Sequence, residues 1–242
     1  MNLNNKSYKF FADFDGTISN PDLGEAMFLR FGNPESVQRS IDYWRQKKIN
    51  SVQLWELLCE SVNNFNEDKF HSFLDEITID PGFVKFADFC ERENFELRIL
   101  SDGFDYYIKR FFEREGLAHT EVYCNHLTVD HDKNLIPSFP YRDEDCSCCA
   151  NCKRNHVLHF SGDEDYTFYI GDGLTDVCAA QFCDFIFAKD SLLRYCEINR
   201  ITYFPFSTFD DIIDKIDSLK KKKRLRKRHQ AELKRREVFL QG

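Results

Sequence analysis

Short apolar runs alternate with helical patterns along most of the chain. Four runs have the length and composition of buried strands: Tyr8–Ala12, Leu97–Leu100, Tyr166–Ile170 and Phe185–Ala188. Helical patterns lie between or after these runs, at residues 83–93, 105–115, 153–160, 174–182 and 191–198. Strands that alternate with helices form a parallel sheet with helices on both faces. The pattern therefore predicts an α/β fold built on a doubly wound, Rossmann-like parallel sheet.

Residues 22–76 interrupt this alternation, because they contain helical patterns only. Pro34 suits the first position of one helix, and Ser51 suits the N-cap of another. The segment Asp80-Pro81-Gly82 has the composition of a turn that returns the chain to the alternating part. We therefore expect an inserted all-helical cap domain. The expected domains are a catalytic core of residues 1–18 and 82–218, a cap of residues 19–81, and a basic C-terminal tail of residues 219–242.

Polar side chains follow three of the expected strands. Asp13 and Asp15 come after the first strand, Ser101 after the second, and Asp172 and Asp176 after the third. In an open parallel sheet, ligands bind beyond the carboxyl ends of the strands, where the strand order reverses. These five side chains are therefore expected to meet in one site.

The residue types in this set match what hydrolysis of a phosphate monoester requires. A carboxylate such as Asp13 can attack phosphorus, and a second carboxyl group such as Asp15 can protonate the leaving oxygen and later activate water. A carboxylate such as Asp172 can help to hold a Mg²⁺ ion, which offsets the repulsion between anionic groups. The Ser101 hydroxyl and the Lys153 ammonium group can hold phosphoryl oxygens. The sequence therefore favours a magnesium-dependent phosphatase.

Four segments resemble, in order and spacing, the four motifs of the haloacid dehalogenase-like hydrolase superfamily. They are Asp13-Phe14-Asp15-Gly16-Thr17, Ser101-Asp102-Gly103, Lys153 and Gly171-Asp172-Gly173-Leu174-Thr175-Asp176. The resemblance spans roughly residues 8–218. It is nearest to the phosphoserine-phosphatase-like branch, in which a helical cap is inserted just after the first motif.

The resemblance implies a role for each residue of the first two motifs. Asp13 would be the nucleophile and a magnesium ligand. Asp15 would be the acid/base and would offer its backbone carbonyl to the metal. Ser101 would bind the phosphoryl group, together with the N–H groups of the residues that follow it, Asp102 and Gly103.

The remaining residues complete the implied site. Lys153 would neutralise the phospho-aspartate, and it is preferred over its neighbour Arg154 because a compact ammonium group suits this role. Asp172 would be the third protein ligand of magnesium, and Asp176 would support the same metal site. Asp22 would lie near the substrate, at the entry to the cap.

Within the superfamily, Asp15 separates phosphatases from dehalogenases, which lack the second aspartate of the first motif. The segment Cys149-Ala150-Asn151-Cys152-Lys153 resembles one found in phosphatases of a methionine-salvage intermediate and in phosphocholine and phosphoethanolamine phosphatases. A small phosphorylated metabolite is therefore the expected substrate. The salvage intermediate, phosphoserine, phosphocholine, phosphoethanolamine and a vitamin phosphate all stay open. The alternative from another class is a non-catalytic binding protein that acts through its basic tail.

The net charge of −8 conceals an uneven distribution. Residues 220–236 contain eleven Lys or Arg and one acid, Glu232, which gives this segment a net charge of +10. The rest of the chain therefore carries −18. An acidic body argues against a nucleic-acid-binding domain, because a phosphate backbone attracts basic surface. The basic segment itself is expected to be a solvated or helical extension.

The N-terminus is polar, and no apolar run has the length of a membrane span. We therefore expect a cytoplasmic protein without a membrane partner, in which the ten cysteines are reduced or bind metal. Cys146, Cys148, Cys149 and Cys152 form a dense cluster that could hold a structural zinc ion. Because Cys148 and Cys149 are adjacent, a tetrahedral arrangement is awkward, and reduced thiols are the preferred interpretation.

Overall fold

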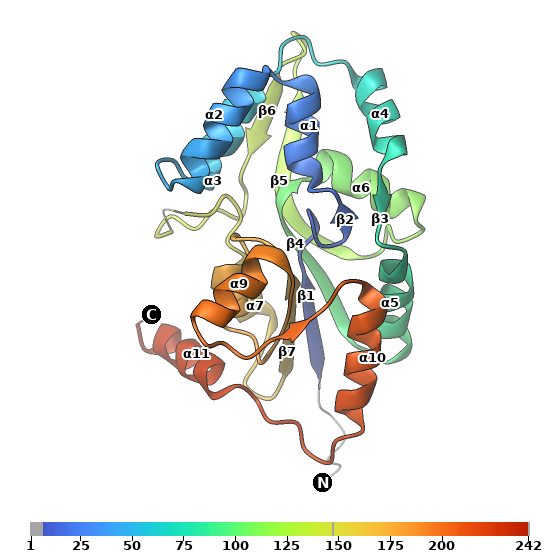
Figure 1. Cartoon of the computed structure of the whole chain (residues 1–242), viewed down its shortest axis with the longest axis vertical. Coiled ribbons are helices and arrows are strands. Elements are labelled where there is room, and N and C mark those ends of the chain that lie inside the picture. Colours follow the sequence, from blue (N-terminus) through green and yellow to red (C-terminus); the bar gives the residue numbers. More distant parts are fainter. Residues whose placement is uncertain (1–6, 147, 242) are drawn as a thin grey trace.

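A computed structural model describes residues 7–146 and 148–241, which form a central sheet with helices on both sides (Figure 1). Within these residues the sheet has the strand order β6-β5-β4-β1-β7-β8-β9. The strands are β1 (Tyr8–Ala12), β4 (Glu96–Phe104), β5 (Glu121–Val129), β6 (Leu135–Ser138), β7 (Tyr166–Gly171), β8 (Phe185–Ala188) and β9 (Phe204–Pro205). Neighbours pair in parallel except β5 and β6. The predicted doubly wound α/β fold is confirmed.

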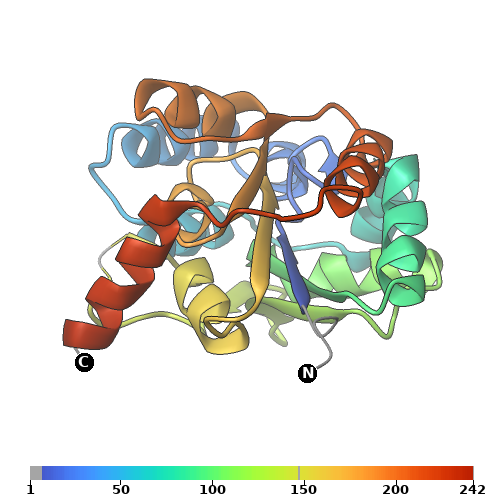
Figure 2. The ribbon, with the colours of Figure 1, turned by 90° about the horizontal axis from the view of Figure 1, so that it is seen from below.

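Successive side chains of the central strands enter two different hydrophobic cores. Phe10 of β1 and Phe168 of β7 pack in the larger core, whereas the next residues, Phe11 and Tyr169, pack in the smaller one. The helices α5 (Pro81–Arg92), α6 (Asp105–Arg114) and α10 (Phe209–Lys220) contribute to the larger core, and α7 (Lys153–Phe160), α8 (Val177–Ala180) and α9 (Asp190–Ile198) to the smaller. Figure 2 shows α5 and α10 together on one side of the strands and α7 on the other. The sheet is thus covered on both faces, which fixes the ends of its strands.

The inserted segment forms four helices at one end of the molecule (Figure 1). They are α1 (Leu23–Phe31), α2 (Pro34–Arg45), α3 (Ser51–Glu60) and α4 (Glu67–Glu76). The antiparallel strands β2 (Ser19–Asn20) and β3 (Thr78–Ile79) lie where the chain enters and leaves this segment. The sequence did not predict them, because two-residue strands carry no periodicity. They lie beside the expected core and cap boundaries at residues 18/19 and 81/82, although Pro81 already belongs to α5, and these boundaries stay a prediction.

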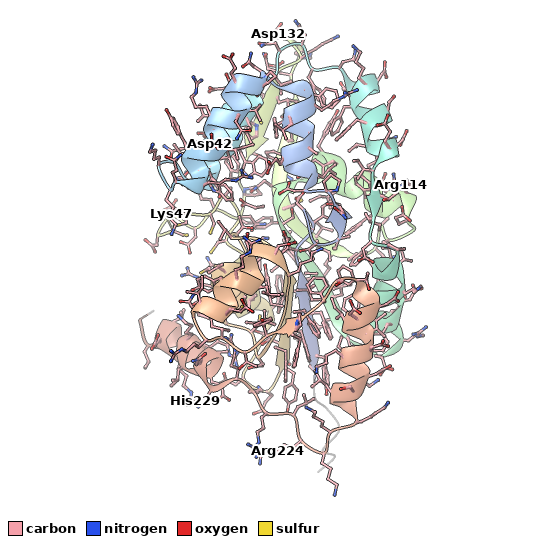
Figure 3. The ribbon with its side chains drawn as sticks, viewed as in Figure 1. Asp42, Lys47, Arg114, Asp132, Arg224 and His229 are labelled. Carbon is pink, nitrogen blue, oxygen red and sulfur yellow. The ribbon has the colours of Figure 1, made fainter. Side chains whose placement is uncertain are left out.

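The β5–β6 hairpin connects the sheet to the cap and was also not predicted. Its strand β6 packs beside α3, and the N–H of Phe65 donates to the carbonyl of Lys133 at 3.1 Å. Asp132 marks the tip of the hairpin at the cap end of the molecule (Figure 3). The cap therefore contacts the core through this hairpin as well as through its stem.

Two helices begin differently from the sequence prediction. Asn50 rather than Ser51 is the N-cap of α3, because its side chain accepts a hydrogen bond from the Gln53 N–H while the Gln53 side chain accepts one from the Asn50 N–H. Asp80 is the N-cap of α5 and Pro81 is its first residue, so the expected turn is the start of a helix. Both differences place the helix start within two residues of the expected position.

Two boundaries near the site also differ. The second expected strand does not end before Ser101, because β4 continues to Phe104. The helix expected over residues 174–182 is shorter, since α8 covers only Val177–Ala180. The preceding residues form a turn in which the N–H groups of Asp172 and Gly173 donate to the Asp176 carboxylate. The loop that carries the third acidic motif is therefore longer than the sequence indicated.

The basic tail is in part a helix held against the core. In α11 (His229–Gln241), Arg235 is buried and pairs with the Asp184 carboxylate at 2.9 Å. Arg228 donates to the carbonyls of Ala180 and Cys183. Arg224 projects at the end of the molecule opposite the cap (Figure 3). Of the two forms expected for the basic extension, solvated or helical, the structure shows a helix over His229–Gln241.

The cysteine cluster has the form of free thiols. Cys146, Cys148, Cys149 and Cys152 make no disulfide, and among the described residues they do not bring three sulfur atoms within metal-binding distance of one another. The structural-zinc alternative therefore gains no support. In the described part of the chain, no helix has both the length and the apolar character that crossing a membrane requires.

Candidate active site

The nine predicted site residues lie together at the carboxyl ends of β1, β4 and β7. Six of them line one pocket of about 110 Å³: Asp13, Asp15, Asp22, Asp102, Gly103 and Asp172. The other three contact this group: Ser101 bonds to Asp15, Lys153 to Asp13, and Asp176 to Lys153. A larger, open hollow of about 630 Å³ lies on the cap, and none of the nine residues lines it.

A tight turn after β1 places the two aspartates of the first motif. The Asp13 N–H donates to the Ile170 carbonyl at 2.9 Å, which extends the pairing of β1 with β7 by one residue. Gly16 has a φ of +78°, and a Cβ at this position would lie only 2.7 Å from Oδ2 of Asp172. Glycine is therefore required both for the backbone conformation and for the close approach of Asp172.

Lys153 joins two of the carboxylates from the first turn of α7. Its Nζ donates to Oδ1 of Asp13 at 2.6 Å and to Oδ1 of Asp176 at 2.7 Å. Lys153 is 2% exposed and Asp176 is fully buried, so solvent does not screen these contacts. The adjacent Arg154 points elsewhere and pairs with Asp143 at 2.7 Å. The geometry thus supports the choice of Lys153 over Arg154.

Both oxygens of the Asp176 carboxylate accept hydrogen bonds from protein donors. Its Oδ1 also accepts the Tyr169 hydroxyl at 2.7 Å, and its Oδ2 accepts the N–H groups of Asp172 and Gly173 at 3.0 and 2.9 Å. Among the described residues, the Asp172 carboxylate accepts a hydrogen bond only from the Thr17 hydroxyl, at Oδ1 and 2.6 Å. Asp176 therefore holds the loop and Lys153 in place, while Asp172 keeps one oxygen for another partner.

Asp15 is held from the core and from the cap entry. Its Oδ2 accepts the Ser101 hydroxyl at 3.0 Å, and its Oδ1 accepts the Gly24 N–H at 3.2 Å. The Tyr107 hydroxyl lies 3.2 Å from both oxygens. The Ser101 oxygen in turn accepts the Gly103 N–H at 2.9 Å. Ser101, expected to bind phosphate, thus also orients the second aspartate.

Asp102 links the core to the cap. Its Oδ2 accepts Nε1 of Trp55 from α3 at 3.4 Å, and its Oδ1 accepts the N–H of Asn151 at 2.8 Å. Asp22 is the N-cap of α1, where its carboxylate accepts the Glu25 N–H at 2.9 Å. Both residues therefore face the pocket from the boundary between core and cap.

The carboxylates raise one another's affinity for protons. Burial, and next the charge of Asp176, raise the pKa of Asp13 well above its ordinary value and that of Asp172 to about 7. Burial, and next the charge of Asp22, raise the pKa of Asp15 to about 7. Burial lowers the pKa of Lys153, but Asp13 and Asp176 outweigh it and leave that pKa above its usual value. The site is therefore short of positive charge.

The donor set suits a small, hard cation. Oxygens of Asp13, Asp172 and Asp176 lie within 4.8 Å of one another, and this is the only such group of potential metal ligands among the described residues. Carboxylate oxygens are the ligands that Mg²⁺ prefers. Because Asp176 already accepts four protein donors, the oxygens best placed for a metal are those of Asp13 and Asp172.

Several residues of the site carried no usable signal in the sequence. Tyr107 and Tyr169 occur in patterns that are typical of buried core, and periodicity does not show which aromatic side chains end in a hydrogen bond. Thr17 lies inside the quoted first motif, so its position could have suggested contact with the site. Glu25 lines the pocket one turn beyond Asp22 and was not singled out.

The comparisons with known proteins agree with this geometry. A family model described as "Putative Phosphatase" matches residues 10–195. A protein of Bacillus mycoides named 2-hydroxy-3-keto-5-methylthiopentenyl-1-phosphate phosphatase is 29% identical over 216 residues, covering 88% of this chain and 97% of its own. A protein of the same name from Bacillus thuringiensis is 30% identical over 212 residues, covering 85% and 94%.

Solved structures show the same fold at lower identity. A phosphoserine phosphatase solved as a phospho-aspartyl intermediate analogue has a TM-score of 0.65 and 16% identity, covering 87% of this chain and 99% of that one. A phosphoserine phosphatase from T. onnurineus has a TM-score of 0.65 and 13% identity, covering 89% and 97%. The chain belongs to the phosphatase family that the matching model describes, and it is a phosphoric monoester hydrolase with the fold of the phosphoserine phosphatases above.

Proposed function

We propose that the chain is a magnesium-dependent phosphatase of a small-molecule phosphate monoester, which reacts through a phosphorylated Asp13. The observation that carries this proposal is the contact of Lys153 with both Asp13 and Asp176, beside Asp172 and Asp15. A buried lysine between two aspartates fits a site that must hold several negative charges during phosphoryl transfer. The nine residues named above are the proposed site.

Mg²⁺ is the proposed cofactor. The fitting residues are Asp13 and Asp172 through their carboxylates and Asp15 through its backbone carbonyl, with Asp176 supporting them. When bound, the ion would offset the charge of the carboxylates and of the phosphoryl group. The raised pKa values of Asp13 and Asp172 support this assignment, because they indicate negative charge that lacks a counter-charge.

The chain's own residues divide the reaction into two steps. In the first, an oxygen of Asp13 attacks phosphorus while Asp15 gives its proton to the leaving oxygen. In the second, Asp15 takes a proton from water as the water attacks phosphorus and releases Asp13. A pKa of about 7 suits Asp15 to both duties near neutral pH. Lys153 and the Ser101 hydroxyl hold charge on the phosphoryl oxygens.

The proposed substrate has an uncharged and partly apolar leaving group. The pocket is bounded on the cap side by an apolar wall, made of Ile41, Trp44, Leu54, Trp55 and Leu58 from α2 and α3. No Lys or Arg is among the described residues that line the pocket, so a substrate carboxylate finds no partner there. The compound in the relatives' names, 2-hydroxy-3-keto-5-methylthiopentenyl-1-phosphate, carries a neutral chain that ends in a methylthio group. It fits this pocket better than phosphoserine does.

A cationic leaving group is the second candidate, on a separate observation. Asp22 and Asp102 line the pocket together with Trp44 and Trp55, and Glu25, which also lines it, pairs with Arg45 at 3.2 Å. Carboxylates and aromatic faces are the groups that hold ammonium ions. Phosphocholine and phosphoethanolamine therefore stay candidate substrates. The family membership disfavours the other alternative, a non-catalytic binding protein that acts through its basic tail.

The test is turnover of p-nitrophenyl phosphate with and without Mg²⁺, by the wild type and by Asp13→Asn. We expect activity that depends on Mg²⁺ and that falls by at least about 10⁴-fold in the variant, because a nucleophile has no substitute. Wild-type turnover by Asp13→Asn would show that the nucleophile is misassigned. A panel of the methylthio compound, phosphoserine, phosphocholine and phosphoethanolamine then ranks the substrates by kcat/KM.

A further inference from the structure

Tyr107 brings a hydroxyl group into the site from the start of α6. The side chain is fully buried, and its hydroxyl lies 3.2 Å from Oδ1 and 3.2 Å from Oδ2 of Asp15. Its ring packs against Phe14 with centroids 6.3 Å apart. Because the ring is fixed by its surroundings, the direction of the hydroxyl is fixed as well. None of the four sequence motifs contains this residue.

The hydroxyl can act only as a donor toward a carboxylate. A tyrosine ordinarily keeps its proton up to about pH 10. With the Ser101 hydroxyl and the Gly24 N–H, the phenol gives the Asp15 carboxylate three donors from three different segments. Three such donors fix the rotation of the Asp15 carboxylate about the Cβ–Cγ bond.

Two glycines leave the space that this contact needs. A Cβ on Gly103 would overlap the Tyr107 hydroxyl and the Asp15 carboxylate, and a Cβ on Gly24 would lie 3.3 Å from the same hydroxyl. Gly103 is one of the predicted substrate-binding residues. The structure gives it a second reason to be glycine, because only a residue without a side chain allows the phenol to reach Asp15.

We propose that Tyr107 is a positioning residue for the general acid, fixing the Asp15 carboxyl group toward the leaving oxygen of the substrate. The inference rests on the proposed function, in which Asp15 is the acid/base. In that reaction an Asp13 oxygen bonds to phosphorus, the bond from phosphorus to the leaving oxygen breaks, and the proton of Asp15 moves to that oxygen. Tyr107 keeps its own proton throughout and does not touch the substrate.

The consequence depends on the leaving group. A poor leaving group needs its proton while the bond breaks, whereas p-nitrophenolate leaves with little help. If the Asp15 carboxyl group loses its orientation, cleavage of a substrate with a poor leaving group therefore slows more than cleavage of p-nitrophenyl phosphate. The ratio kcat/KM is the proper measure, because it reports the steps up to departure of the leaving group and is independent of the later hydrolysis of the phospho-aspartate.

The experiment compares Tyr107→Phe with Tyr106→Phe in the full chain with Mg²⁺. Tyr106 is the matched control, since it precedes Tyr107 in α6 and its hydroxyl binds Glu67, away from the site. The probes are p-nitrophenyl phosphate and phenyl phosphate, which differ in leaving-group strength but little in shape. For Tyr107→Phe we expect kcat/KM to fall about tenfold with phenyl phosphate and less than about threefold with p-nitrophenyl phosphate. The Tyr106→Phe variant should match the wild type with both probes.

Equal losses with both probes, or no loss with either, would overturn the proposal. Gly103→Ala provides a second route if Tyr107→Phe does not fold, because it keeps the phenol and intrudes between it and Asp15; the same steeper dependence on the leaving group is expected. A wild type that hydrolyses neither probe would instead contradict the proposed function. The two failures are thus distinguishable.

Discussion

The floor and the wall of the pocket are built in opposite ways. The charged floor, made of Asp13, Lys153, Asp172 and Asp176, comes from strand ends, loops and the first turn of α7 in the core, and its hydrogen bonds measure 2.6 to 3.0 Å. The apolar wall comes from cap helices α2 and α3. From this wall, Trp55 donates a longer hydrogen bond to Asp102, at 3.4 Å.

This difference separates reaction from substrate choice. The floor is held in place because Asp176 accepts four protein donors and Lys153 contacts both Asp13 and Asp176, and fixed dipoles are what stabilise charge in a transition state. The wall offers side chains that meet only the leaving group. Changes to the floor should therefore alter the rate with every substrate, and changes to the wall should alter the ranking of substrates.

After the loss of the nucleophile Asp13, the largest expected effect is at Lys153. Lys153→Met should lower kcat by about 10³-fold with every substrate, because the phosphoryl oxygens and Asp13 lose their fixed cation. The matched control is Arg154→Met, next in sequence but paired with Asp143, for which less than a threefold change is expected. Steady-state kinetics of both variants decide the matter. A larger loss at Arg154 than at Lys153 would reverse the assignment.

The wall should respond differently. Leu54→Asn should raise KM for the methylthio substrate and lower its kcat/KM about tenfold, because a polar group then faces the methylthio end. Leu57 lies on the same helix but is exposed and does not line the pocket, so Leu57→Asn should have no such effect. Kinetics with the full phosphate panel test this pair. An equal loss of kcat with all substrates would contradict this prediction, because Leu54 would then affect the reaction itself and not the choice of substrate.

The smallest expected effect concerns stability without metal. The pKa of Asp172 is raised to about 7 in the folded chain, above its ordinary value of 3.8. Its stabilising contribution is therefore present below about pH 4 and is lost as the pH rises through 7. In EDTA, the Tm of the wild type should fall by a few degrees more between pH 6 and 8 than that of Asp172→Asn. Added Mg²⁺ should raise the wild-type Tm more at pH 8 than at pH 6, because protons compete for the same oxygens. Thermal melts with the opposite order would count against the metal assignment.

The sequence predicted the floor better than the wall, for a physical reason. Asp13, Asp15 and Asp172 follow apolar runs at strand ends, and parallel strands bring their ends together whatever lies between them. The side chains of Trp55 and Tyr107 instead reach the site through the packing of helices against the sheet. Helical periodicity indicates that they are buried but not where they end. Likewise β2 and β3 were missed, because they pair with each other across the whole inserted segment, and the β5–β6 hairpin was missed although its two strands are neighbours in sequence.

The central claim is that Asp13 carries the phosphoryl group during turnover. The most direct measurement is an acid quench of the wild type during turnover with Mg²⁺, followed by mass spectrometry of its peptides. We predict that the peptide containing Asp13 gains the mass of one phosphoryl group, localised to Asp13 by fragmentation, and that Asp15→Asn accumulates more of it because hydrolysis of the intermediate lacks its base. Phosphorylation of another residue, or none in either protein while turnover continues, would contradict the account.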